Sequence, residues 1–221
     1  MALSKLQYNS LNVTPSASKG IRFNSGANGF EAASAGGNLT LIKTTTLASA
    51  AATIDFVNGA SDVVLDGTYK EYIFYLNNIH PASDNVTFQF NGSDDTSSHA
   101  YNITKTTTAF NAYHNEADSE ASLGYRAADD LAQGTGFHTL SNQASNDNDA
   151  CLAGHFHLFE PSSTTFVKHF VARISGNNED NHAQDNYSAG YFNTTAAITA
   201  IQFKFGSGNI DAGSISLYGV N

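Results

Sequence analysis

The chain has 221 residues, of which 41% are hydrophobic and 14% are charged, and it includes 15 Phe and 10 Tyr. This charged share lies well below the ~25% of typical domains, so Asn, Ser, Thr and Gly must supply most of the polar surface. The net charge of -10 excludes a surface that attracts nucleic-acid phosphates, and no stretch reaches the ~18 apolar residues of a membrane span. We therefore expect neither nucleic acid nor a membrane as a partner.

Residues 1–38 are rich in Ser, Asn, Ala and Gly, with turn residues but little period-2 alternation. We interpret them as an extended arm or small β extension, with a disordered tail as the alternative. The start lacks a basic region followed by an apolar core, which predicts synthesis in a cytoplasm without a secretion signal. Several apolar residues are expected to attach this arm to a neighbouring subunit: Leu6, Tyr8, Leu11, Val13, Ile21 and Phe23.

Strand patterns recur from Leu39 onwards, separated by turn clusters. The aromatic and β-branched run Tyr69–Ile79 is typical of a central strand. In residues 85–91, three apolar residues alternate with polar ones and so share a face of a half-buried strand, namely Val86, Phe88 and Phe90.

The middle segment, residues 111–148, is the least regular part of the sequence. A short helix is one interpretation of residues 120–133, because apolar residues recur there at helical spacing, although Gly124 weakens it. This segment is also the candidate ligand surface, because loops on a rigid sandwich often carry function and aromatic rings stack on sugars. Its candidate residues are Tyr113, His114, Tyr125, Phe137 and His138. The alternative is that these rings pack against the core or a neighbouring protomer.

The second half returns to strand patterns, including 154–160 and 165–174. His155 and His157 project from one strand face, and His169 on a nearby predicted strand completes a possible set of metal ligands. The competing interpretation, histidines bonded to backbone carbonyls, is favoured because no carboxylate or Cys sits at a diagnostic spacing. We assign no cofactor, and the single cysteine, Cys151, excludes an intrachain disulfide.

Eight to ten short strands and almost no helix predict an all-β fold, an antiparallel β-sandwich of the jelly-roll type with an extended N-terminal arm. The expected division is an arm at 1–38 and a sandwich domain at 39–221. The sequence contains neither a Gly-x-Ser-x-Gly elbow nor a phosphate-binding loop, so we assign no catalytic residue and predict that the chain is not an enzyme.

Three stretches, residues 1–24, 162–169 and 205–221, together resemble structural proteins of marine tailed bacteriophages such as cyanophages. The resemblance implies a virion protein exposed on the particle, as a tail fibre with a role in host attachment or as a capsid decoration protein. It implies no catalytic residues. The partners expected from it are other virion proteins and a host surface glycan, with homo-oligomeric, trimeric assembly.

Two other classes of function stay open at this point. One is a carbohydrate-binding, lectin-like module that is not tied to a virion. The other is an esterase or glycosidase on the same scaffold, which requires a carboxylate pair or a triad close in space. Fold alone does not decide among them.

Overall fold

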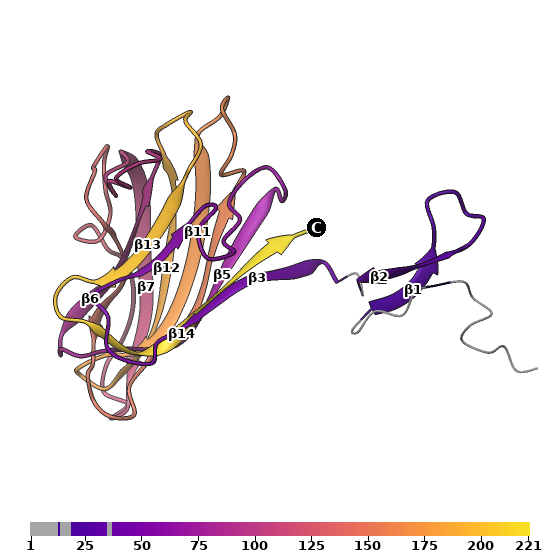
Figure 1. Cartoon of the computed structure of the whole chain (residues 1–221). Coiled ribbons are helices and arrows are strands. Elements are labelled where there is room, and N and C mark those ends of the chain that lie inside the picture. Colours follow the sequence, from indigo (N-terminus) through magenta and orange to yellow (C-terminus); the bar gives the residue numbers. More distant parts are fainter. Residues whose placement is uncertain (1–12, 14–18, 35–36) are drawn as a thin grey trace, which may run out of the picture. The chain divides into compact units, whose positions relative to one another are not determined.

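The computed structural model describes residue 13 and residues 19–34 and 37–221. It divides into two compact units, Met1–Asn38 and Leu39–Asn221. The predicted all-β class is confirmed, because the regular elements of the described residues are all strands and every pairing is antiparallel (Figure 1). The described residues contain no helix long and apolar enough to cross a membrane.

The N-terminal unit contains a hairpin of β1 (Lys19–Phe23) and β2 (Phe30–Ser34). The ring centroids of Phe23 and Phe30 lie 4.9 Å apart, and both rings are exposed, as is Ile21. Two of the predicted attachment residues, Ile21 and Phe23, therefore present apolar surface on this hairpin, and Val13 is half-buried. Leu6, Tyr8 and Leu11 lie outside the described residues.

The second unit is a sandwich of two sheets. The large sheet has the order β3-β14-β5-β10-β11-β12-β7-β8, and the small sheet has the order β4-β13-β6-β9. The large-sheet strands are β3 (Leu39–Thr46), β5 (Glu71–Pro81), β7 (Lys105–Asn115), β8 (Ala121–Tyr125), β10 (Leu152–Phe159), β11 (Lys168–Asn177), β12 (His182–Phe192) and β14 (Ile210–Val220). The small-sheet strands are β4 (Ile54–Val57), β6 (Val86–Ser93), β9 (His138–Ala144) and β13 (Ala200–Phe205).

The apolar core forms where alternate side chains of the two sheets meet. Val86, Phe88 and Phe90 of β6 are all buried, as their alternation predicts. Phe90 reaches from the small sheet to the rings of Phe156 and Phe170 on the large sheet, at centroid distances of 4.5 and 4.9 Å. Such tilted and edge-on ring pairs are the arrangements that aromatic side chains prefer in a packed interior.

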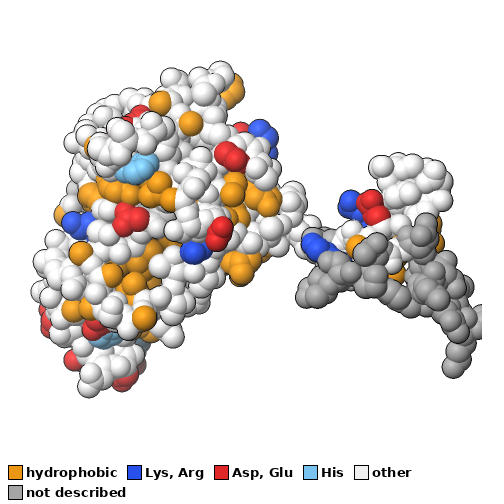
Figure 2. Space-filling model, viewed as in Figure 1, with side chains coloured by type: hydrophobic (Ala, Val, Ile, Leu, Met, Phe, Trp, Pro, Cys, Tyr) orange, Lys and Arg blue, Asp and Glu red, His pale blue; other side chains and the backbone are white. Residues whose placement is uncertain are grey.

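One side of the interior is polar. The inward-facing residues of β7 and β12, opposite β9, are mostly hydroxyl and amide side chains, and they are buried. They include Thr107, Asn111, Gln184, Asn186 and Ser188. Uncharged polar side chains therefore occur inside the sandwich as well as on its surface. In Figure 2 most of the surface is white, and the charged side chains occur as isolated groups.

The helix interpretation of residues 120–133 is wrong. Ala121–Tyr125 form β8, an edge strand beside β7, and turns and bridges follow it. All five residues of β8 are exposed. The apolar residues at helical spacing therefore do not form the buried stripe of an amphipathic helix. Asn115 forms the turn instead, because its side-chain Oδ1 accepts hydrogen bonds from the backbone N–H groups of Ser119 and Glu120, at 2.9 and 3.0 Å.

Candidate functional site

The outer face of the large sheet, the face turned away from the small sheet, carries a continuous row of large side chains. Its members are direct register partners on six neighbouring strands, β8, β7, β12, β11, β10 and β5. We call this set the aromatic row: Tyr125, Phe110, Tyr187, Arg173, His155 and Tyr75. Tyr125, on the edge strand β8, is 58% exposed, and Phe110, in the middle of β7, is 43% exposed. Both values are high for large rings in a sheet.

Neighbouring members of the aromatic row stack on one another. Phe110 and Tyr187 are parallel, with centroids 4.7 Å apart and an interplanar angle of 5°. The Arg173 guanidinium lies 5.1 Å from the centroid of the Tyr187 ring, a cation–π distance. The rings of His155 and Tyr75 continue the row at 6.4 Å. The row therefore forms a rigid surface that requires little further ordering when a partner binds.

A paired charge fixes the centre of the row. Asp185 accepts hydrogen bonds from Nε of Arg173 at 2.9 Å and from Nη2 at 2.7 Å, and the Tyr187 hydroxyl donates to it at 3.0 Å. The bond from Arg173 is the main reason why the pKa of Asp185 lies below its usual range, and the bond to Asp185 raises the pKa of Tyr187. The pair presents donor and acceptor atoms without net charge beside exposed rings.

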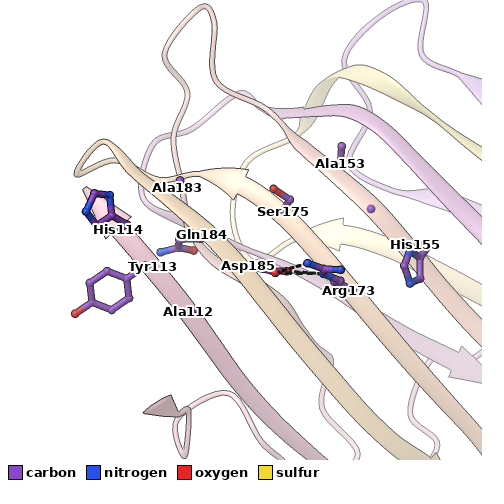
Figure 3. A pocket seen from close by; sticks show the side chains of 11 residues that line it. Ala112, Tyr113, His114, Ala153, His155, Arg173, Ser175, Ala183, Gln184 and Asp185 are labelled. Atoms are coloured by element: carbon purple, nitrogen blue, oxygen red, sulfur yellow. Dashed lines mark hydrogen bonds and ion pairs between the residues drawn. The ribbon is translucent and has the colours of Figure 1, made fainter. Parts of the chain in front are cut away.

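A shallow groove of about 520 Å³ runs beside the aromatic row across β7, β12, β11 and β10 (Figure 3). Small side chains line it, among them Ala112, Ala153 and Ala183. His155 and Arg173 of the aromatic row border it, and Figure 3 shows Arg173 reaching towards Asp185 on the next strand. The small residues leave the row standing above its surroundings.

The five sequence-predicted contact residues do not form one surface. Tyr125 belongs to the aromatic row, and its hydroxyl donates to Asp130. Tyr113 and His114 are consecutive on β7, so their side chains point to opposite faces of the sheet. Phe137 lies beneath the Lys204 ammonium, which is 5.0 Å from the ring centroid. Including His138 was wrong, because its side chain is fully buried and hydrogen-bonded to Thr107.

The three histidines considered as metal ligands contact different partners. His155 and His157 share the outer face of β10, as predicted, with ring centroids 4.9 Å apart. Nδ1 of His157 lies 2.6 Å from a carboxylate oxygen of Glu71, and the His169 ring lies 5.9 Å from that of Tyr191. Burial, followed by the neighbouring His157 and Arg173, lowers the pKa of His155. Among the described residues, no cluster of three or more His, Cys, Asp and Glu side chains is arranged to hold a metal.

Sequence reasoning missed Phe110, Tyr187 and Asp185. Alternation could place each on a strand face, but the row exists only through the pairing of β7, β12 and β11, which no local pattern encodes. Comparison with known proteins found no matching family model, no similar curated protein and no similar solved structure.

Proposed function

We propose that the protein is a non-enzymatic structural protein of a tailed-bacteriophage particle, exposed on the virion as a tail-fibre, receptor-contacting module or as a capsid decoration protein. Support comes from the three stretches at 1–24, 162–169 and 205–221 that resemble marine phage structural proteins. The low charge and the aromatic content suit a building block that gains stability by burying aromatic surface between subunits.

The order of the strands supports the jelly-roll part of the proposal. Without β7, β8, β11 and β12, the sheets have the orders β3-β14-β5-β10 and β4-β13-β6-β9. Numbered along the chain, these eight strands run 1-8-3-6 and 2-7-4-5, which is the order of a jelly roll with two Greek keys. Viral capsid domains and lectins both use this architecture. The four remaining strands lengthen the large sheet beyond β10.

The aromatic row is the observation that carries the proposal of assembly. Tyr, Phe and Arg are enriched at the centres of protein interfaces, and the row exposes all three in fixed positions. We propose that the outer face packs against another copy of the chain in a homotrimer, with other virion proteins as further partners. The exposed Ile21 and Phe23 of the N-terminal hairpin support the arm as a second attachment device.

Mass spectrometry and immunogold labelling of purified phage particles test the virion assignment. The chain should be present in a defined, many-fold copy number, and antibodies against the folded protein should label intact particles. Particles that contain the chain without binding antibody would contradict surface exposure. Absence of the chain from particles whose other structural proteins are all detected would contradict the assignment itself.

A lectin-like module outside a virion is the second candidate. It is favoured by the juxtaposition of exposed rings with the Arg173–Asp185 pair, because rings stack on sugar faces while paired polar groups bond to hydroxyls. Under this candidate, the protein alone should bind defined glycans on an array, and Tyr187→Ala or Tyr125→Ala should abolish binding. Phe166→Ala, at an exposed ring outside the aromatic row, should leave that binding intact.

A further inference from the structure

A second cleft, of about 430 Å³, lies on the opposite face of β7 and β12 from the aromatic row. We call it the polar cleft, because its lining consists almost entirely of polar side chains. Residues that line it and enter the argument are Asn111, Tyr113, Glu120, Arg126, His182 and Gln184. Side chains alternate along a strand, so Asn111 and Gln184 face away from their outer-face neighbours Phe110 and Asp185. The cleft is thus separate from the surface assigned to assembly.

Two buried amides line the cleft. Asn111 is only 3% exposed, and its Nδ2 has no hydrogen-bond partner among the described residues. Gln184 is 5% exposed, and its Oε1 accepts a long bond of 3.5 Å from Asn186. Buried amide groups in native proteins are almost always hydrogen-bonded, and the acceptor for Asn111 Nδ2 is not among the described residues, so a molecule in the cleft that Asn111 lines can supply it.

The Tyr113 ring and the Glu120 carboxylate line the same cleft as these amides, and both are held by contacts within the chain. The Tyr113 ring stacks on the His182 imidazole, with centroids 4.9 Å apart and an interplanar angle of 19°. The Tyr113 hydroxyl donates to Oε1 of Glu120 at 3.0 Å, and Nε2 of His182 lies 3.6 Å from Oε2. Each carboxylate oxygen has further lone pairs, so Glu120 can accept additional hydrogen bonds without moving.

The charge of the cleft restricts the class of ligand. Glu120 and Asp180 face it with one cation, Arg126, whose Nε already donates to Asp129 at 3.1 Å. An anion would meet an excess of carboxylates on a chain with a net charge of -10. The amides donate and the carboxylates accept, and a hydroxyl group can satisfy both, since it is donor and acceptor at once. A neutral molecule with several neighbouring hydroxyls fits this lining best.

We infer that the polar cleft binds a neutral sugar ring, with the Asn111 amide donating to one hydroxyl and Glu120 accepting from another. The cavity lies within the ~300–1,000 Å³ of ordinary small-molecule sites, and its polar lining is unusual for that class, which favours a polar ligand. This inference goes beyond the virion proposal and does not depend on it, because the site is complete within one chain.

The test uses the full-length protein and saturation-transfer NMR with glucose, galactose, mannose and N-acetylglucosamine as separate probes, with glucuronate and calcium chloride for comparison. At least one neutral sugar should bind at millimolar concentration or better. Asn111→Leu should weaken it at least tenfold, and the thermal midpoint should stay the same or rise, because the substitution removes a buried donor that no atom of the described residues satisfies. Glu120→Gln, at an exposed side chain, should weaken binding several-fold in a protein that keeps its fold.

Asn142→Leu is the matched control. Asn142 is 5% exposed and its Oδ1 also lacks a partner among the described residues, but it does not line the polar cleft. This variant should bind the sugar like the wild type. The inference is overturned if none of the four neutral sugars binds, if only glucuronate or calcium binds, or if Asn111→Leu and Glu120→Gln both retain wild-type affinity.

Discussion

Among the described residues, three basic side chains are buried in the interior, namely Lys105, His138 and Lys168. The Lys105 ammonium donates to the carbonyls of Ile103 and Gly136 at 3.0 and 2.6 Å, and its burial lowers the pKa to about 8. Lys168 donates to the carbonyl of Thr194 at 3.1 Å. Backbone carbonyls, rather than carboxylates, therefore take the place of counter-ions, and burial of each charge is compensated only in part.

His138 should make the protein acid-sensitive. Burial, assisted by the nearby Lys105 charge, lowers its pKa to about 4, against about 6.5 in the unfolded chain. The unfolded state therefore binds more protons between these values, and the free energy of unfolding falls as the pH drops from about 6.5 to 4, by up to about 3 kcal/mol. Urea unfolding at pH 7, 5.5 and 4 should show this loss. His138→Gln, which does not titrate, should reduce it; an equally steep decline in the variant would refute the assignment.

Phe90 should be among the most costly core residues to truncate. Its fully buried ring lies against Phe156 and Phe170 of the large sheet and Phe203 of the small sheet, so Phe90→Ala leaves a cavity at the centre of the sandwich. We expect a loss of about 3–5 kcal/mol in the free energy of unfolding. Phe166→Ala, at a ring that is 73% exposed, serves as the control and should cost less than about 0.5 kcal/mol. Similar losses in the two variants, measured by urea unfolding, would contradict this position for Phe90.

At the scale of elements, the long strand β14 depends on a bulge. Its register with β5 shifts on both sides of Ala212, and Gly213 has a φ of +116° there. A Cβ at Gly213 would lie 2.5 Å from the carbonyl oxygen of Asn78. The position thus requires glycine for both its backbone conformation and its close contact with β5.

Gly213→Ala should therefore destabilise the sandwich by about 3 kcal/mol, since backbone strain and a steric overlap act together. Gly59 offers a matched control: its φ is +79°, but no atom lies within 4 Å of the place that an alanine Cβ would occupy. Gly59→Ala should cost only the backbone term, about 1 kcal/mol. The comparison is made by thermal and urea unfolding, and equal losses would show that the contact with Asn78 is relaxed at little cost.

The strands were more predictable than their arrangement. Alternation identified β6, and the aromatic and β-branched composition of residues 69–79 identified β5. It failed for β8, where every residue is exposed and no pattern of burial exists. The sequence groups Tyr113 with His114 because both lie in its least regular segment, whereas the two are adjacent on β7 and face opposite ways. The order of the sheets is set by contacts between distant segments, so the aromatic row could not be found from local sequence.

At the scale of the molecule, the large sheet has two different faces. On its inner face an apolar core gives way to buried amides and the polar cleft, and on its outer face it carries the aromatic row. An exposed row of rings costs solubility unless it is covered, so such a surface usually marks an interface. We therefore propose that the outer face mediates assembly.

Sedimentation velocity of the full-length chain at micromolar concentration measures this assembly. We expect a species of three times the 23.4 kDa of one chain. Phe110→Ser combined with Tyr187→Ser should convert it to the monomer, because two interface rings are lost. Phe166→Ser, at an exposed ring outside the row, should stay assembled. A wild-type protein that sediments only as a monomer, or a double variant that assembles like the wild type, would contradict the claim.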